Sequence, residues 1–221
     1  MKNLKIFLLI LCINFSITSA SALEGQIEFD SVYIDYSILK EKQYIINGDN
    51  YLRKAENPKI SKTKIQQDFN YRQALGSYIT ATEISPETVV TYGKIGYIYH
   101  KLGKYTLARS NFDHGLNLQR NNPYVSYLYA GFYFDNQDFN KAMKYYKIAQ
   151  KNNYPNKYSL YYNIGETNEK LGDLVRAKHF YSMAYALKTS DKLKAKMQAI
   201  DALQYMKSQY YMRKKPYYYN D

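Results

Sequence analysis

Histidines and paired carboxylates are the side chains of this chain that could perform acid–base or metal chemistry. The three histidines, His100, His114 and His179, lie far apart, and no two have the i, i+4 spacing that brings two metal ligands together on one helix. Glu166 and Glu169 share one face of a predicted helix, which is as typical of a solvated surface as of an acid–base pair. Phosphate-binding, serine-nucleophile and zinc-protease motifs do not occur. We therefore predict that the chain is not an enzyme and holds no metal and no cofactor.

The first 22 residues have the three parts of a secretion signal. Lys2 and Lys5 give a basic start, residues 6–15 form a short apolar run, and residues 20–22 (Ala-Ser-Ala) have the small-x-small pattern that a signal peptidase cleaves. The apolar run is shorter than the ~20 residues of a membrane span, so cleavage is favoured over retention as an anchor. We predict cleavage after Ala22 and an exported chain, either periplasmic or secreted.

Cys12 is the only cysteine, and it lies inside this signal. The bulky Leu11 before it does not fit the small residue that a lipoprotein signal carries there. Removal of the signal would leave a mature chain without disulfides or thiolate metal ligands.

The net charge is +12, and it becomes +10 if Lys2 and Lys5 leave with the signal. The basic residues are scattered, with no run of five or more, so we predict no nucleic-acid binding. The densest cluster is residues 213–215 (Arg-Lys-Lys), next to a predicted basic helix. These residues favour one alternative function, a peripheral membrane or polyanion binder acting through the C-terminal helix and tail.

The elements that must position any site repeat along the chain. Ala74, Ala108, Ala142 and Ala177 recur at intervals of 34, 34 and 35 residues. A large apolar residue lies three positions before each alanine, an aromatic residue four positions after it, and a small residue seven positions after it; the aromatic residues are Tyr78, Phe112, Tyr146 and Tyr181. This 3-4-3 spacing predicts one face of a helix, with small residues where two helices approach closely.

A second helix with its own pattern precedes each of these helices. Its small residue is Gly96, Ala130 or Gly165, with aromatic residues nearby. The predicted turns between the two helices are residues 102–105, 136–139 and 171–174, where Gly or Asn can take a helix-ending conformation.

These patterns resemble tetratricopeptide repeats, with Tyr in place of the usual Trp. The resemblance implies an all-α solenoid, a right-handed superhelix of about four helical hairpins closed by a C-terminal capping helix. It also implies a protein or peptide partner.

The predicted organisation is a signal peptide at 1–22, an N-terminal extension at 23–37, helical repeats at 38–190, a capping helix at 191–212 and a flexible tail at 213–221. The repeats divide into an irregular unit at 38–87 and regular units at 88–122, 123–156 and 157–190. The irregular unit needs an insertion of about fourteen residues around residues 57–59, which lengthens either its loop or its second helix. In the capping helix, Leu193, Met197, Ile200, Leu203 and Met206 lie on one side.

The resemblance implies that the first helices of successive hairpins line an inner groove that binds a peptide. The candidate groove residues are Lys94, Tyr97, His100, Lys101, Tyr127, Gly131, Phe134, Tyr162, Asn163 and Glu166, with Leu128, Asp135, Glu169 and Lys170 beside them. Their order along the chain predicts a basic edge, an aromatic middle and an acidic edge.

Gly131 has two interpretations. Its missing side chain could leave a pocket between Tyr97, Tyr127 and Phe134 for an apolar side chain of a partner, or it could permit close packing of two helices. Some members of the family hold a partner's C-terminal carboxylate with Lys and Asn; Lys94 and Asn163 lie on the predicted groove, but Gly93 replaces one expected basic residue.

The predicted function is therefore an exported protein–protein interaction module, an adaptor, scaffold or assembly factor of the cell envelope, which binds a peptide or protein segment in this groove.

Overall fold

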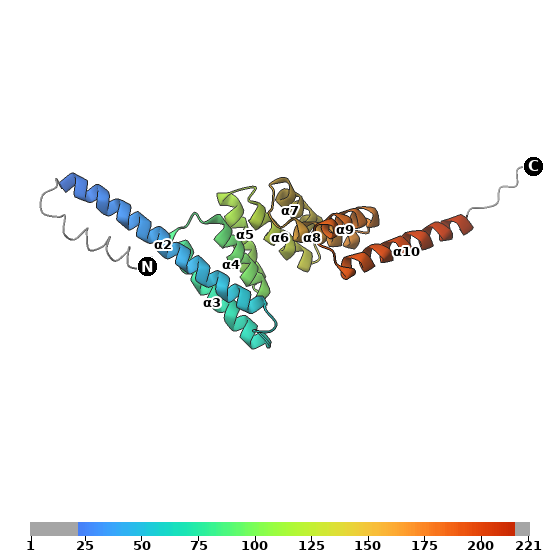
Figure 1. Cartoon of the computed structure of the whole chain (residues 1–221), viewed down its shortest axis with the longest axis horizontal. Coiled ribbons are helices and arrows are strands. Elements are labelled where there is room, and N and C mark those ends of the chain that lie inside the picture. Colours follow the sequence, from blue (N-terminus) through green and yellow to red (C-terminus); the bar gives the residue numbers. More distant parts are fainter. Residues whose placement is uncertain (1–21, 215–221) are drawn as a thin grey trace, which may run out of the picture. The chain divides into compact units, whose positions relative to one another are not determined.

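The computed structural model describes residues 22–214, with side chains described for residues 37–210. All nine helices of this part are α-helices joined by short links (Figure 1). The chain forms two compact units, Met1–Pro86 and Glu87–Asp221, which we describe separately. Residues 1–21 of the predicted signal and residues 215–221 of the predicted tail lie outside the described part.

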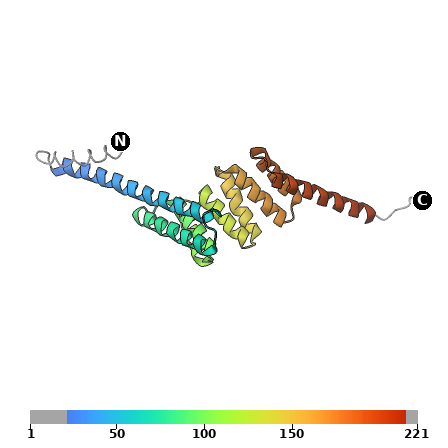
Figure 2. The ribbon, with the colours of Figure 1, turned by 60° about the horizontal axis from the view of Figure 1, so that its bottom comes forward.

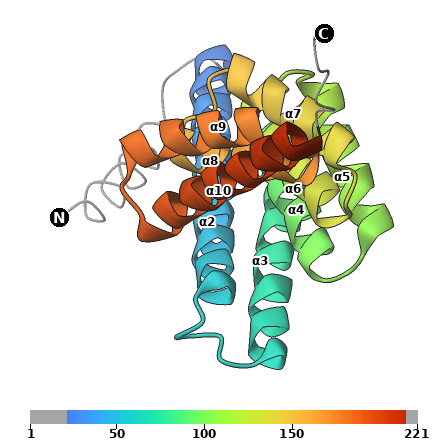
Figure 3. The same cartoon turned by 90° about the vertical axis from the view of Figure 1, so that its right-hand side faces the viewer.

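Unit one is a single long hairpin. Helix α2 (Ala22–Glu56) and helix α3 (Lys64–Ile84) lie side by side and antiparallel (Figures 1 and 3). At the start of α3, the Thr63 side chain accepts a hydrogen bond from the Gln66 backbone N–H, and the Gln66 side chain accepts one from the Thr63 backbone N–H. The link at 57–63 is short, whereas the helices have 35 and 21 residues. The predicted extra residues therefore lengthen helix α3 and also the link, which is longer than the three-residue links of the other hairpins, and the predicted N-terminal extension is part of α2.

Unit two contains three shorter hairpins and a last helix, which occupy successive positions in Figure 2. Their bounds are α4 (Val89–Lys101) with α5 (Tyr105–Leu118), α6 (Pro123–Asp135) with α7 (Phe139–Lys151), α8 (Lys157–Lys170) with α9 (Leu174–Leu187), and finally α10 (Asp191–Lys214). The predicted all-α fold of helical hairpins with a C-terminal helix is confirmed.

The turn inside each of these hairpins needs one residue with left-handed backbone. Gly103 and Gly172 provide it, with φ angles of 73° and 81°, as predicted. In the middle hairpin Gln137 has φ 62°, whereas Asn136 has φ −87°. Asn136 is therefore not the left-handed residue of this turn. It directly follows the last residue of α6, and its side chain donates a hydrogen bond to the Phe132 carbonyl.

Within a hairpin, a ring of the second helix lies against a small residue of the first. A methyl group added to Gly165 would lie 2.6 Å from the Tyr181 ring, and one added to Gly96 would lie 3.0 Å from Phe112. Unit one has the same contact, since a methyl group added to Gly48 would lie 2.5 Å from the Tyr78 ring. All three rings are fully buried. We refer to this arrangement as the ring-on-small-residue contact.

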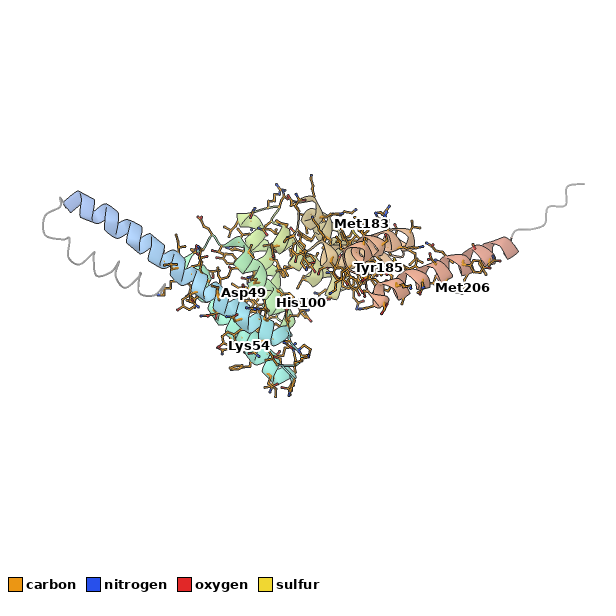
Figure 4. The ribbon with its side chains drawn as sticks, viewed as in Figure 1. Asp49, Lys54, His100, Met183, Tyr185 and Met206 are labelled. Carbon is orange, nitrogen blue, oxygen red and sulfur yellow. The ribbon has the colours of Figure 1, made fainter. Side chains whose placement is uncertain are left out.

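Helix α10 packs on the last hairpin with its first half. Leu193 and Ile200 are buried in one cluster with Ala177, Tyr181 and Ala184 of α9, and Figure 3 shows α10 running across α8 and α9. Leu203 is 44% exposed and Met206 is 57% exposed, and Figure 4 labels Met206 on the outer part of this helix. The apolar side predicted for α10 therefore packs only as far as Ile200.

Lys196 of α10 forms ion pairs with two carboxylates of α8. Its Nζ lies 2.9 Å from Glu169 Oε2 and 3.4 Å from Glu166 Oε1. The Tyr181 hydroxyl also donates a hydrogen bond to Glu169. Burial acts to raise the pKa of Glu169, but the hydrogen bonds from Tyr181 and Lys196 and the positive charge of Lys196 outweigh it, so this pKa lies below its ordinary value.

We predict that Gly165→Ala destabilises unit two by about 1–2 kcal/mol. The new methyl group forces the buried Tyr181 ring to move, and the energetic cost of this movement exceeds the gain from the better helix propensity of Ala. Gly131→Ala is the matched control in the same unit, since only the Tyr146 hydroxyl, at 3.9 Å, would meet its methyl group. We expect Gly131→Ala to stabilise by about 0.5–1 kcal/mol. Urea unfolding followed by circular dichroism measures both changes, and equal effects of the two variants would contradict the ring-on-small-residue contact.

We also predict that acid weakens the attachment of α10 through Glu169. Because the folded-state pKa of Glu169 is depressed, its stabilising contribution is present above the unfolded pKa of about 4.3 and is lost as the pH falls through the lower folded value. Glu169→Gln removes this contribution. The free energy of unfolding, measured by urea titration between about pH 3 and pH 7, should fall more steeply with acid in the unsubstituted chain than in the variant. Parallel curves would argue against the role of Glu169.

Candidate functional site

A pocket of about 230 Å³ opens in unit two among helices α4, α6, α7 and α8. Its lining consists of aromatic, polar and charged side chains with one glycine. The lining residues are Tyr97, His100, Lys101, Tyr127, Leu128, Gly131, Phe134, Asp135, Tyr146, Asn163 and Glu166.

The structure brings most of the sequence-predicted groove residues together in this pocket. The predicted residues in its lining are Tyr97, His100, Lys101, Tyr127, Gly131, Phe134, Asn163 and Glu166. Lys94 is not among the lining residues. Tyr162 instead lines a neighbouring pocket, which shares Tyr127 and Asn163 with the first.

Gly131 does not permit a close approach of two helices. The nearest atom to an added methyl group is the Tyr146 hydroxyl at 3.9 Å, whereas Gly96 and Gly165 have ring atoms at 3.0 and 2.6 Å. The packing role in the third hairpin belongs to Ala130, which is buried in one cluster with Tyr146. The close-packing interpretation of Gly131 is therefore wrong, and its missing side chain leaves space in the pocket.

Tyr146 is the lining residue that the sequence pattern did not place at the groove. It belongs to α7, the second helix of its hairpin, and the repeat pattern predicted a packing ring at this position. Tyr146 is only 2% exposed, as that pattern requires. The sequence feature that could have predicted this role of Tyr146 is Gly131, the glycine after Ala130. Because Gly131 has no side chain, it does not cover the hydroxyl end of the Tyr146 ring.

The basic edge predicted at α4 is neutralised by Asp135. Lys101 Nζ lies 3.3 Å from Asp135 Oδ2, and His100 Nε2 lies 3.5 Å from the same oxygen. The His100 side chain is 8% exposed at the end of α4, where Figure 4 labels it. Burial lowers the pKa of His100 and the charge of Lys101 lowers it further, so the imidazole is neutral at pH 7.

The acidic edge predicted at α8 is also paired. Glu166 accepts a hydrogen bond of 2.8 Å from the Tyr162 hydroxyl and lies 3.4 Å from Lys196 Nζ. Charged residues of both predicted edges, Lys101 and Glu166, are therefore paired with residues of neighbouring helices.

Tyr127 forms a firmly held wall between the two pockets. Its hydroxyl accepts a hydrogen bond of 2.9 Å from Asn163 Nδ2, and its ring stacks on Tyr154 with the ring centres 4.1 Å apart. The Tyr146 ring lies 5.8 Å away. Burial raises the pKa of both Tyr127 and Tyr146, so both phenols keep their protons at neutral pH.

The other two histidines lie against aromatic rings. His114 is 4.3 Å from Tyr92 and His179 is 5.4 Å from Phe180, measured between ring centres. Within residues 22–214, and among the side chains described there (residues 37–210), no group of three metal-ligating side chains comes together. Among the helices of the same part, none combines the length and the apolar character needed to cross a membrane.

A family model described as tetratricopeptide repeat matches residues 89–122, which form α4, α5 and the link to α6. No curated protein matches the chain in sequence.

Several solved structures share the fold. PilF of Pseudomonas aeruginosa aligns with a TM-score of 0.63 at 19% identity, over 79% of this chain and 72% of that one. A MamA RS-1 double mutant aligns with a TM-score of 0.57 at 16% identity, over 75% of this chain and 85% of that one. A chain of the APC/C hetero-tetramer Cut9-Hcn1 aligns with a TM-score of 0.53 at 18% identity, over 63% of this chain and 29% of that one.

At these identities the likeness is one of fold. The family match covers one of the three hairpins of unit two, and the other hairpins repeat its arrangement of helices. Residues 89–122 therefore match the tetratricopeptide repeat model, and the chain has an all-helical fold of tetratricopeptide type.

Proposed function

We propose that this chain is a protein–protein interaction scaffold that binds a segment of a partner protein over α4, α6 and α8. One side chain of the partner enters the pocket at Gly131. The observation that carries this proposal is the open space beside Gly131, surrounded by the rings of Tyr97, Tyr127 and Phe134. Repeats of this family are typically binding scaffolds without catalytic activity.

The composition of the pocket favours binding over catalysis. Aromatic rings offer a large apolar contact area at a small loss of conformational entropy, and such residues dominate the energy of protein interfaces. The ionisable groups have structural partners, since Asp135 pairs with Lys101 and Glu166 pairs with Lys196. A general base would need a group free to accept a proton from a substrate.

We further propose that the chain is exported, periplasmic or secreted, and acts as an adaptor or assembly factor of the cell envelope. The support for export is the sequence of residues 1–22, with its basic start, short apolar run and Ala-Ser-Ala end. The chain has no cysteine after Cys12, which suits an oxidising compartment.

The test is photo-crosslinking in the native cell from a photoreactive residue at Tyr97, with mass spectrometry of the captured protein. We expect one discrete partner, and we expect Gly131→Gln to reduce its capture at least tenfold by filling the pocket. The stability of this variant should change by less than about 1 kcal/mol, because the added side chain extends into open space.

Gly76→Gln is the matched control, since Gly76 has no atom within 4 Å of an added methyl group and lies in unit one, away from the pocket. Capture from Tyr97 that is insensitive to Gly131→Gln would contradict the pocket. Strong capture from a photoreactive residue at Tyr210 of α10, with none at Tyr97, would instead support the membrane or polyanion alternative or another contact made by the C-terminal helix.

A further inference from the structure

The pocket at Gly131 combines aromatic rings with two carboxylates. The rings of Tyr97, Tyr127, Phe134 and Tyr146 come from α4, α6 and α7, while Asp135 belongs to α6 and Glu166 to α8. An aromatic ring has a negative face that attracts cations, and a carboxylate beside it adds to this attraction. Such a surface differs from a purely apolar pocket in the side chain that it prefers.

A lysine of the chain itself already uses part of this surface. The Nζ atom of Lys101 lies 5.2 Å from the centre of the Tyr97 ring and 3.3 Å from Asp135 Oδ2. The Tyr97 face and the Asp135 carboxylate are therefore placed so that one ammonium group can contact both.

The charges of the lining favour a cation over an anion. Lys101 is its only positively charged residue at pH 7, because His100 is held neutral by burial, while Asp135 and Glu166 are both acidic. Lys196 of α10 pairs with the negative charge of Glu166, but it is not part of the lining. An acidic side chain of a partner would meet two carboxylates at close range.

We propose that the partner side chain bound at Gly131 is a long basic one, lysine or arginine, rather than the apolar one predicted from the sequence. Its aliphatic stem lies among the rings, and its charged head lies near Asp135 and Glu166. This inference rests on the proposed binding of a partner segment. It specifies that the partner segment carries a basic residue, the anchor, at the position that enters the pocket.

A basic anchor is favoured because a partner that covers the groove removes water from the two carboxylates. A neutral anchor would remove water from Asp135 and Glu166 without replacing its hydrogen bonds, and such a loss weakens binding. A lysine or arginine head supplies new donors in place of that water. The aliphatic stem contacts the rings as an apolar side chain would.

The first step of the test is to obtain peptides that depend on the pocket. A random peptide display library is selected on the purified chain and counter-selected on Gly131→Gln. The selected peptides are then synthesised in matched versions that differ only at the anchor residue, which is lysine, arginine, norleucine or glutamate. Norleucine is the decisive comparison, because it resembles lysine in its aliphatic stem and lacks the ammonium group.

We expect the lysine and arginine versions to bind about tenfold more tightly than the norleucine version in titration calorimetry. Asp135→Asn and Glu166→Gln should each reduce this preference severalfold, whereas Glu87→Gln, an exposed position outside the lining, should leave it unchanged. Lys101→Met should strengthen binding of the basic peptides, because it removes the resident ammonium that competes for Tyr97 and Asp135.

Equal or tighter binding of the norleucine version would overturn the basic anchor but leave the pocket and the proposed function in place. Tightest binding of the glutamate version would also overturn it. If selection yields no peptide that distinguishes the chain from Gly131→Gln, the proposed function itself fails, and the basic anchor fails with it.

Discussion

The contact between a buried aromatic ring and a small residue sets the geometry of every hairpin that the structure describes. Tyr78 lies against Gly48, Phe112 against Gly96 and Tyr181 against Gly165, and in each pair a methyl group on the glycine would come within about 3 Å of the ring. In these three hairpins the two helices approach so closely because one of them has no side chain at that point. The third hairpin uses Ala130 in the same place, so the glycine after it has no packing role. The pocket exists because Ala130, which the packing of the hairpin requires, is followed by Gly131, which has no packing role and leaves open space.

The many tyrosines of these helices link the packing of the fold to the chemistry of its surface. A tyrosine fills an interior with its ring and carries a hydroxyl to the edge of the layer. Tyr181 and Tyr162 donate hydrogen bonds to Glu169 and Glu166, and Tyr127 accepts one from Asn163. Because each hydroxyl is held by a residue of the same or a neighbouring helix, the groove side chains are positioned before any partner arrives, which reduces the entropy lost on binding.

Much of the fold follows from the sequence because its determinants are local. The 34-residue spacing of the repeat alanines predicts the hairpins. The resemblance to tetratricopeptide repeats implies that the first helix of each hairpin lines a groove, and with the helical period it gives most lining residues of the pocket. The features that were not predicted depend on neighbours that a helical period does not specify. Tyr146 reaches the pocket from the opposite helix of its hairpin, and the pairing of Lys101 with Asp135 requires knowing how one hairpin sits beside the next. Gln137 takes a backbone conformation that its residue type does not favour, because the hairpin turn fixes the geometry at that position.

The hydrogen bonds around the pocket limit where hairpins can be added to or removed from this chain. The ring-on-small-residue contacts lie within single hairpins, so a duplicated hairpin would bring its own copy and could be inserted without loss of packing. The bonds from Lys101 to Asp135 and from Asn163 to Tyr127 join residues 34 and 36 positions apart, each between adjacent hairpins. A duplication inserted at either junction would separate the partners and divide the pocket. Hairpins could therefore be added at the ends of unit two without dividing the pocket, whereas the loss of any of its three hairpins would remove part of the lining.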